Sequence, residues 1–329
     1  MNILVTGANG FIGSSVVNKL VETTQHNVCV LIRKTSNIER LKKNIDKVKI
    51  FYGDVRDKKS LIEPVTSADV VIHSAAVLRC VNNKTYYEVN YLGTKNLIET
   101  ILNYNPNIKK FIFLSSQAAA GPSKCITFKK VADECKPVSH YGKSKFLAEQ
   151  ELKKYFDRIN IIILRPGAVY GPEDKDMFIY FQLAEKGLFP VFTKKFYIQF
   201  TYIHDLIFVI EKIISLEGLS NKTFFVAEDK CYSIEEIKSI FEKIVDKKIK
   251  VVHIPYILGY IFAFLNEKFY ALVYNKPALF NRDKLAEMSK NYWICESSEL
   301  KKYIPNFCYT PLSVGVKETY FWYKKNNWL

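Results

Sequence analysis

Short apolar runs alternate with stretches of helical spacing through the first half of the chain. The helical spacing recurs at residues 14–22, 83–104 and 141–155. The apolar runs lie at Asn2–Thr6, Asn27–Ile32, Val48–Tyr52, Val70–His73, Phe111–Leu114 and Ile159–Leu164. Because these runs are apolar on both faces, they are typical of strands covered on both sides. The alternation therefore predicts an α/β fold, a doubly wound parallel sheet with helices on both faces.

Beyond about Gly171 the alternation loosens. We expect helices near 177–186, 205–216, 233–245 and 311–323, with short strands near 223–227 and 251–254. This part resembles a smaller α+β cap over the open edge of the sheet. We therefore divide the chain into residues 1–171 and 172–329, with some later segments returning to the first domain.

The longest apolar stretch, Ile254–Tyr274, is interrupted by Asn266, Glu267 and Lys268. The interruption favours a buried or surface-resting amphipathic helix over a membrane span. A helix lying on a membrane is the lesser alternative.

Composition narrows the class of protein. The 329 residues are 48% apolar, which supports a sizeable core. Seven scattered cysteines without a C-x-x-C pair argue against a disulfide framework or a metal site and suit a cytoplasmic protein. Because an apolar strand is predicted from Asn2 onwards, we expect no signal peptide. The net charge of +15 comes from lysine pairs spread along the chain. Solvated lysines are the favoured interpretation, a field that attracts anionic ligands is the alternative, and no nucleic-acid-binding motif is present.

A glycine-rich turn follows the first predicted strand. Gly7, Gly10 and Gly13 are spaced G-x-x-G-x-x-G, and helical spacing begins directly after them. Strand, glycine turn and helix together present free backbone amides and a positive helix end to a phosphate. Gly7 permits the tight turn, Gly10 a close approach of pyrophosphate, and Gly13 close packing of the helix. We expect a dinucleotide site here, with Phe11 and Ile12 of the same turn among its contacts.

Two later positions bear on which dinucleotide binds. Arg33, twenty positions after Gly13, replaces the acidic residue that would bond a ribose 2′-hydroxyl. An arginine pairs instead with a 2′-phosphate, so NADP is favoured over NAD, although two solvated bases, Arg33 and Lys34, are the alternative. Asp54, followed by Val55, is expected to accept a hydrogen bond from the adenine amino group or to cap a turn.

Tyr141 and Lys145 form a candidate proton-transfer pair. At positions i and i+4 they share one face of the predicted helix. A nearby ammonium lowers a phenol pKa and makes the tyrosine a usable acid or base. Ser116, at the end of a strand, is placed to polarise a substrate carbonyl, or else caps the next turn.

These motifs resemble the extended short-chain dehydrogenases/reductases of the NAD-dependent epimerase/dehydratase superfamily. The similarity covers about half of the chain and rests on the glycine turn, Gly53-Asp54, His73-Ser74-Ala75-Ala76, Asn90-x-x-Gly93-Thr94, Ser115-Ser116, Tyr141-x-x-x-Lys145 and Arg165-Pro166-Gly167 with Tyr170-Gly171-Pro172.

The resemblance implies a Rossmann-type cofactor domain over 1–171 and a substrate-binding cap over 172–329. It implies catalytic roles for Ser116, Tyr141 and Lys145, with a possible homodimer. It also implies cofactor contacts by Ala75, Ala76, Asn90, Pro166 and Val169.

Some family features are missing. Dehydratases that act on nucleotide sugars carry Asp-Glu after the catalytic Ser/Thr, where this chain has Gln117-Ala118. The asparagine and arginine that grip a sugar nucleotide's diphosphate are also not matched. The chain is more similar to the dihydroflavonol-4-reductase and 3β-hydroxysteroid dehydrogenase branch, which acts on less charged substrates. Aromatic residues of the second half would suit such a substrate or fill the core, namely Phe189, Phe192, Phe196, Tyr197, Tyr256, Phe262 and Tyr270.

Three functions are compatible with these residues. The favoured one is an NADP-dependent oxidoreductase that interconverts a small-molecule carbonyl and its alcohol. The second is an NAD-dependent sugar epimerase that uses the same three residues. The third, a cofactor-binding sensor without turnover, is disfavoured by the intact Tyr/Lys pair.

Overall fold

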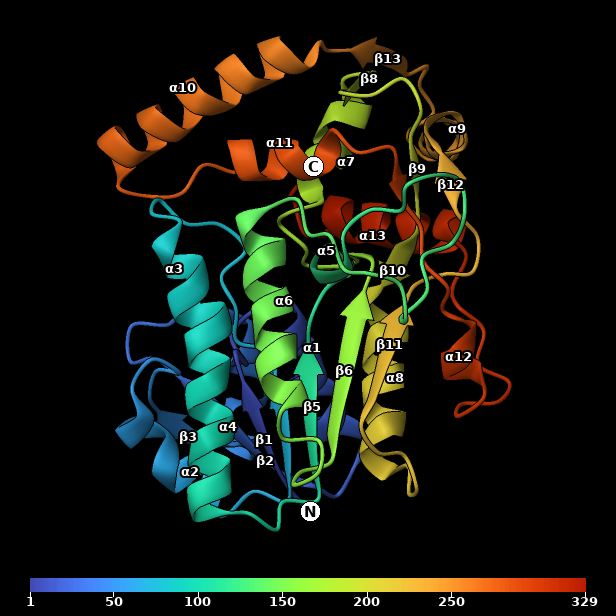
Figure 1. The fold of residues 1–329 in the computed structure, drawn as a ribbon. Coiled ribbons are helices and arrows are strands. Elements are labelled where there is room, and N and C mark those ends of the chain that lie inside the picture. The colour runs from blue at the N-terminus through green and yellow to red at the C-terminus, as the bar shows by residue number, and fades with distance from the viewer.

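A seven-stranded parallel sheet forms the centre of the computed structural model, which describes residues 1–329 (Figure 1). The strand order is β11-β6-β5-β4-β1-β2-β3. The strands are β1 (Asn2–Thr6), β2 (Asn27–Ile32), β3 (Lys49–Tyr52), β4 (Val70–His73), β5 (Lys110–Leu114), β6 (Ile161–Pro166) and β11 (Lys222–Val226). The predicted doubly wound α/β fold is confirmed. Strand β11 lies beyond residue 171, and the domain boundary placed there remains a prediction.

Helices cover both faces of this sheet, as the two-sided apolar strands require. Alternate residues of β1 enter two separate cores, because successive side chains of a strand point to opposite faces. Ile3 and Val5 pack with helices α1 and α8, whereas Leu4 packs with α2, α4 and α6. The helices are α1 (Phe11–Thr23), α2 (Ile62–Thr66), α4 (Gly93–Tyr104), α6 (His140–Lys153) and α8 (Ile203–Ser215).

Shorter elements join these helices. A π-helical turn, Tyr87–Leu92, interrupts the long helix predicted at 83–104, and such turns often mark functional sites. The others are α3 (Lys84–Tyr86), α5 (Gln117–Ala120) and the 3₁₀ turns Glu39–Lys47 and Lys58–Leu61.

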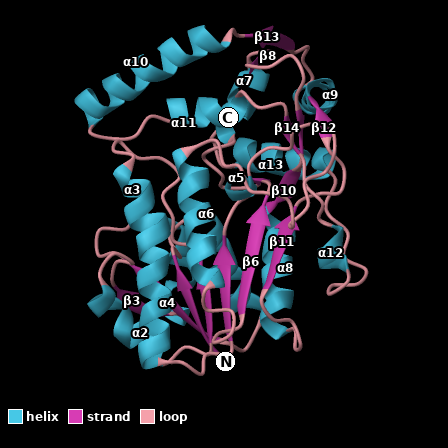
Figure 2. Cartoon of the chain, in the orientation of Figure 1, coloured by secondary structure: helices cyan, strands magenta, loops and turns pink.

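The second half of the chain builds a smaller layer beyond the carboxyl ends of the sheet strands (Figures 1 and 2). Three small sheets, β10-β7, β12-β9-β14 and β13-β8, hold it together. Its strands are β7 (Ala168–Tyr170), β8 (Leu188–Val191), β9 (Tyr197–Ile198), β10 (Phe200–Tyr202), β12 (Tyr232–Ser233), β13 (Lys250–His253) and β14 (Tyr292–Trp293). Its helices are α7 (Phe178–Glu185), α9 (Ile234–Val245), α10 (Tyr256–Tyr274), α11 (Arg282–Met288), α12 (Ser298–Lys301) and α13 (Leu312–Lys325).

The chain reverses its direction of travel across the sheet at β1. Strands β2 and β3 lie on one side of β1, and β4, β5, β6 and β11 lie on the other. Ligands of open α/β sheets bind beyond the carboxyl ends of the strands at such a reversal. The fold therefore places the glycine turn, at the end of β1, beside the second layer.

Helix α10 lies at the edge of the molecule, beyond α11 (Figure 1). Most of its large apolar side chains are exposed, so of the two expected forms, buried or surface-resting, the surface-resting one is found. None of the helices combines the length and the apolar character that crossing a membrane requires.

Candidate active site

A cavity of about 420 Å³ lies between the carboxyl ends of the sheet strands and the second layer. Residues from both halves of the chain line it, so it exists only when the two layers are assembled. The predicted site residues that line it are Gly7, Gly10, Phe11, Ile12, Gly13, Ala76, Ser116, Tyr141, Lys145, Pro166 and Val169. The other predicted ones, Arg33, Asp54, Val55, Ala75 and Asn90, do not line it.

The glycine turn closes tightly on the end of β4. Gly7 has φ +67°, and a Cβ there would come 2.5 Å from the backbone nitrogen of Ala75. A Cβ on Gly13 would come 2.2 Å from the Gly7 carbonyl oxygen. The backbone of Ala75 therefore packs against the glycine turn. Helix α1 begins after Gly10 without a side-chain cap, which leaves first-turn amides available to an anion at the cavity wall.

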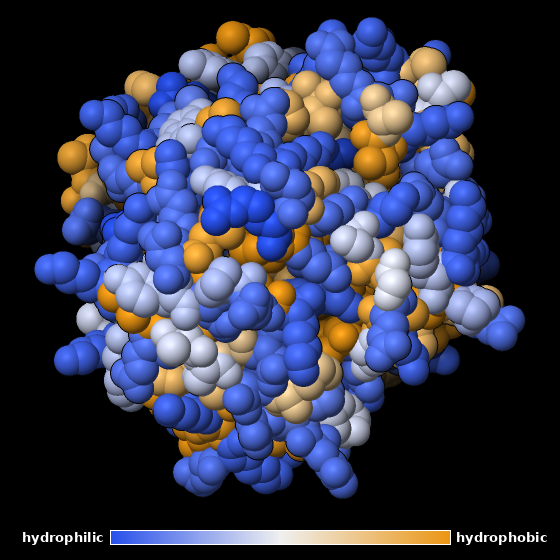
Figure 3. All heavy atoms as spheres, turned by 60° about the horizontal axis from the view of Figure 1, so that its bottom comes forward, coloured by the Kyte–Doolittle hydropathy of each residue, from blue (hydrophilic) through white to orange (hydrophobic).

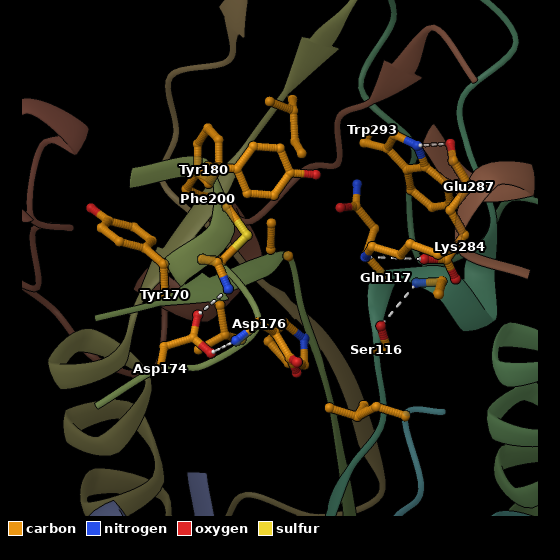
Figure 4. A pocket seen from close by; sticks show the side chains of 18 of the residues that line it. Ser116, Gln117, Tyr170, Asp174, Asp176, Tyr180, Phe200, Lys284, Glu287 and Trp293 are labelled. Atoms are coloured by element: carbon orange, nitrogen blue, oxygen red, sulfur yellow. Dashed lines mark hydrogen bonds and ion pairs between the residues drawn. The ribbon is translucent and has the colours of Figure 1, made fainter. Parts of the chain in front are cut away.

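Ser116, Tyr141 and Lys145 come together at one wall of the cavity. Ser116 is the N-cap of α5, where its hydroxyl accepts a hydrogen bond from the Ala118 amide at 3.1 Å. The capping alternative is therefore realised, and the same side chain also faces the cavity (Figure 4). Lys145 is buried, and its ammonium donates to the carbonyl oxygen of Leu114 at 2.6 Å.

The pKa of Tyr141 differs from the sequence-based expectation. Burial in the apolar cavity and the Glu287 carboxylate raise this pKa above its usual value, and hydrogen bonding with Ser116 offsets only part of the rise. Lys145 does not lower it; burial instead lowers the pKa of Lys145 itself to about 7. The expected lowering of the phenol pKa by the lysine is therefore wrong for this structure, because both groups lose solvation. The phenol is held in its protonated form.

Carboxylates of α11 hold the start of α6, where Tyr141 lies. Asp283 accepts hydrogen bonds from the backbone amides of His140 and Tyr141, at 2.5 and 3.1 Å. Glu287 accepts a hydrogen bond of 2.7 Å from Ser139, the N-cap of α6. A negative charge at a helix N-terminus is favourable. Helix α11 therefore fixes the position of Tyr141, a connection over about 140 residues that no local sequence signal marks.

Asn90 supports the segment after β4 without lining the cavity. Its side chain accepts from the Val77 amide at 2.8 Å and donates to the Val77 carbonyl at 3.1 Å. It also donates to Ser144 of α6 at 3.0 Å. Asn90 thus ties the cavity wall to the helix that carries Tyr141. Val55 is likewise a packing residue, because a Cβ on Gly93 would meet its side chain at 2.6 Å.

Arg33 and Asp54 lie at the ends of β2 and β3, away from the cavity. Arg33 is exposed. Asp54 is paired with Arg56, whose guanidinium donates to both carboxylate oxygens at 3.0 and 2.7 Å. This pairing, which was not predicted from the sequence, lowers the pKa of Asp54, and the charge of Arg33 adds to the effect. The Asp54 carboxylate is therefore already neutralised by Arg56.

The rest of the cavity is mostly apolar, with aromatic residues and a few polar side chains. Ser116, Gln117, Lys284, Glu287 and Trp293 face Tyr170, Asp174, Tyr180 and Phe200 across it (Figure 4). Of the aromatic residues proposed from the sequence, Phe189, Phe192 and Phe196 line it, whereas Tyr197, Tyr256, Phe262 and Tyr270 do not.

The charged residues that line the cavity are two lysines and the carboxylates Asp174, Asp176 and Glu287. Its cations are Lys145 and Lys284, and Lys284 is paired with Glu287 at 3.6 Å. Burial raises the pKa of Asp174, another lining residue, to about 6. No arginine lines the cavity. Away from the glycine turn, the aromatic part of the cavity therefore suits an apolar group better than a second diphosphate.

Comparison with known proteins assigns the family. Residues 3–226 match the NAD dependent epimerase/dehydratase family, and the chain belongs to it. The chain is 26% identical over 273 residues to the N-acetyl-alpha-D-glucosaminyl-diphospho-ditrans,octacis-undecaprenol 4-epimerase of Escherichia coli O157:H7, covering 78% of this chain and 76% of that protein. It is 26% identical over 278 residues to a decarboxylating sterol-4-alpha-carboxylate 3-dehydrogenase of Mus musculus, covering 79% and 73%. The relatives thus include both epimerases and dehydrogenases.

Solved structures share the fold over nearly the whole chain. The UDP-glucose 4-epimerase of Thermotoga maritima with UDP-glucose superimposes with a TM-score of 0.79 at 21% identity, covering 99% of this chain and 100% of that one. The UDP-glucuronic acid 4-epimerase of Bacillus cereus, in complex with UDP-glucuronic acid and NAD, gives 0.77 at 22% identity with the same coverage.

Proposed function

We propose that this protein is a nicotinamide-dependent oxidoreductase that interconverts a carbonyl and a secondary alcohol. One observation carries the proposal: Ser116, Tyr141, Lys145 and the glycine turn line a single cavity. The residues fit a dinucleotide, because the turn is tight enough to exclude a Cβ at Gly7 and Gly13 and leaves uncapped helix amides for a pyrophosphate. Bound nicotinamide would supply or accept the hydride.

Side chains of the protein supply the proton, polarise the carbonyl and hold the cofactor. Tyr141, held protonated by burial and by Glu287, donates a proton to the carbonyl oxygen during reduction. Ser116 polarises the same oxygen from the wall of the cavity. Lys145 lies one helical turn after Tyr141 and is placed to hold a ribose hydroxyl or to return a proton to the phenol.

The substrate has a large apolar part. Aromatic walls and the lack of arginine favour such a molecule over a free sugar nucleotide. The names of two relatives fit this choice, since one acts on an undecaprenol-linked substrate and the other on a sterol. Similarity at 26% identity supports the class of substrate and does not select between these two.

The cofactor is NADP. Arg33 and Arg56 are exposed at the ends of β2 and β3, and the Asp54 carboxylate beside them is paired with Arg56. A 2′-phosphate fits beside these arginines better than a free 2′-hydroxyl, which needs an acceptor. NAD, which a structural neighbour binds, is the alternative.

The epimerase alternative uses the same three residues and is favoured by the names of several relatives. Its substrate carbon is oxidised and then reduced on the other face, so no net redox change occurs. Protein that arrives with firmly bound NAD and interconverts isomers without consuming cofactor would support this alternative.

The test begins with fluorescence titration of NADPH and NADH, followed by screening of cyclic apolar ketones for reduction. We expect tighter binding of NADPH, and a loss of about 10²- to 10⁴-fold in turnover for Tyr141→Phe with cofactor binding retained. Tyr180→Phe, at a second cavity tyrosine, is the matched control and should keep most of its turnover. Full turnover in Tyr141→Phe would overturn the catalytic assignment.

A further inference from the structure

Helix α10 packs on the protein through a narrow strip of small residues. Gly259 and Ala263 are its only buried residues. A Cβ on Gly259 would meet the ring of Phe192 at 2.7 Å and Leu285 at 3.2 Å. Polar contacts anchor the same side, since Asn266 donates to the Phe280 carbonyl at 2.7 Å and Glu267 pairs with Arg282 at 2.8 Å.

The remaining surface of α10 is apolar and open, and we call it the α10 face. Leu272 is 84% exposed, and Ile257 and Phe262 are each more than 60% exposed. Twelve of the twenty-five exposed large hydrophobic side chains of the protein lie on this one helix of nineteen residues. They are Tyr256, Ile257, Leu258, Tyr260, Ile261, Phe262, Phe264, Leu265, Phe269, Leu272, Val273 and Tyr274.

Scattered exposed hydrophobic residues are ordinary, but a contiguous patch of this kind marks an interaction surface. Another face of the molecule, shown in Figure 3, differs from α10. Hydrophilic residues dominate there, and apolar residues form smaller areas between them. The α10 face thus differs from the face that Figure 3 shows.

We propose that the α10 face docks on the surface of an anionic lipid bilayer. Four exposed lysines without an ion-pair partner flank or lie on the helix, namely Lys248, Lys250, Lys268 and Lys276. Glu267 is the only acidic residue between positions 247 and 282, and it is already paired with Arg282. Apolar side chains bordered by unpaired cations bind anionic lipid surfaces through burial and charge together.

The tyrosines of α10 also fit a helix that lies on the surface of a bilayer. Tyr256 and Tyr260 lie near its start, and Tyr270 and Tyr274 lie at its end. Tyrosine favours the boundary between lipid and water, where the ring is apolar and the hydroxyl remains hydrated. A helix lying flat in that boundary satisfies both ends at once, whereas α10 does not combine the length and apolar character needed to cross a bilayer.

A second copy of this chain is a less favourable occupant. Two α10 faces brought together would bring two sets of unpaired lysines close to each other, with no free carboxylate on either face to compensate. Like charges across an interface are costly. An anionic bilayer, by contrast, supplies the missing negative charge.

An aromatic path joins the α10 face to the cavity. Phe192 lines the cavity and stacks on Phe280 with ring centroids 5.4 Å apart. Phe280 in turn contacts Phe262, at 5.8 Å, on the α10 face. This step rests on the proposed function: a substrate with an apolar part would pass from the lipid to the active site along this path. The docking itself does not depend on it.

The experiment is flotation of the full chain with vesicles of phosphatidylcholine alone and of an equal mixture with phosphatidylglycerol. The test variant is Leu265→Glu with Leu272→Glu, and the matched control is Val314→Glu with Phe321→Glu, at exposed apolar positions of α13. Circular dichroism checks the fold of each. A Lys268→Gln, Lys276→Gln variant tests the charge component.

We expect wild type and the α13 control to float with the anionic vesicles and the α10 variant to remain unbound, with at least about a tenfold loss of affinity. The lysine variant should bind more weakly, and added salt should weaken the wild type. Wild type that floats with neither vesicle, or an α10 variant that floats as well as wild type, would overturn the proposal. So would a wild-type dimer in sedimentation that ignores vesicles and that the α10 variant converts to monomer. Cofactor titration without vesicles reports on the proposed function separately.

Discussion

Helices α8 and α10 are both strongly apolar, but they place their apolar side chains in opposite environments. Eight of the thirteen residues of α8 are buried, including Leu206, Ile210 and Ile213, which pack toward the sheet and α1. Only two of the nineteen residues of α10 are buried, and both are small. Apolar content alone therefore does not determine burial.

The difference follows from the pattern of side chains on each helix. In α8, polar residues such as Glu211 and Lys212 mark a solvent side, so the apolar stripe has one direction in which to pack. In α10 large apolar side chains surround the helix, and only a strip at Gly259 and Ala263 is small enough for close contact with Phe192. An all-round apolar helix is typical of a core or a lipid environment. Helix α10 has no core around it.

The ion pairs of the two regions also differ in burial. Breaking the buried pair should give the largest change in the free energy of unfolding. Arg165 pairs with Glu149 at 2.5 Å, with both side chains almost fully buried, and Glu149 also accepts from Ser115. Arg165→Met should lower the free energy of unfolding by about 3–5 kcal/mol, because it leaves a buried carboxylate without its partner. Urea unfolding followed by circular dichroism measures this.

The α10 counterpart, Arg282→Met, should cost at most about 1 kcal/mol, because its pair with Glu267 is partly exposed. Adding Glu149→Leu to Arg165→Met should restore part of the loss by removing the uncompensated charge. Equal losses for Arg165→Met and Arg282→Met would contradict the contrast between the two regions.

Packing of α8 provides the next effect. Ile210 is fully buried. Ile210→Ala removes this packing and should cost about 2–5 kcal/mol of unfolding free energy. Leu265→Ala on α10, a helix of similar character, should change it by no more than about 0.5 kcal/mol because that side chain is mostly exposed. A large loss for Leu265→Ala would mean that α10 is covered in solution.

Lys145 is buried, whereas Lys268 on α10 is exposed. The burial of Lys145 predicts that stability depends on pH. In the folded chain burial lowers the pKa of Lys145 to about 7, whereas in the unfolded chain it lies near the ordinary 10.4. Between these values the unfolded state binds more protons, so stability rises as pH increases and is lost as pH falls toward 7.

Lys145→Met removes this contribution, which amounts to as much as about 1.4 kcal/mol for each pH unit. Urea unfolding at several pH values between neutral and mildly alkaline should therefore give a flatter curve for Lys145→Met than for wild type. Lys268→Met, on exposed α10, is the control and should follow the wild-type slope. Parallel curves for wild type and Lys145→Met would show that burial does not shift the titration of Lys145.

Local patterns were sufficient for the sheet and for much of the site. The apolar runs placed six of the seven main strands to within about two residues, because a strand buried on both faces is a continuous apolar run. The seventh, β11, was predicted to within one residue at 223–227, but as part of the cap and not of the main sheet. The glycine turn, Ser116, Tyr141 and Lys145 were found from short motifs whose members lie on one or two elements. These motifs converge because the carboxyl ends of parallel strands share one edge.

Features that depend on distant partners were not predictable. Asp283 and Glu287 reach the start of α6 from about 140 residues away. Burial of Tyr141 beneath the second layer, with a smaller contribution from Glu287, reversed the expected direction of its pKa. Asp54 and Arg56 are close in sequence, but the sequence does not show which way their side chains point. The structure shows that Arg56 donates to the carboxylate that was expected to bind adenine. The exposure of α10 depends on which surfaces the rest of the chain leaves free, and periodicity does not report that.

The smallest expected effect is also the most direct test of the contrast between the helices. Leu272 is 84% exposed, so Leu272→Ser removes a side chain that water already surrounds. The free energy of unfolding should change by no more than about 0.5 kcal/mol, whereas Ile213→Ser in α8 should lose several kcal/mol through a cavity and a buried hydroxyl. Urea midpoints of both variants, measured together without lipid, give the comparison. A loss above about 2 kcal/mol for Leu272→Ser would place that side chain against protein in solution, and the α10 face would then be an internal or subunit contact.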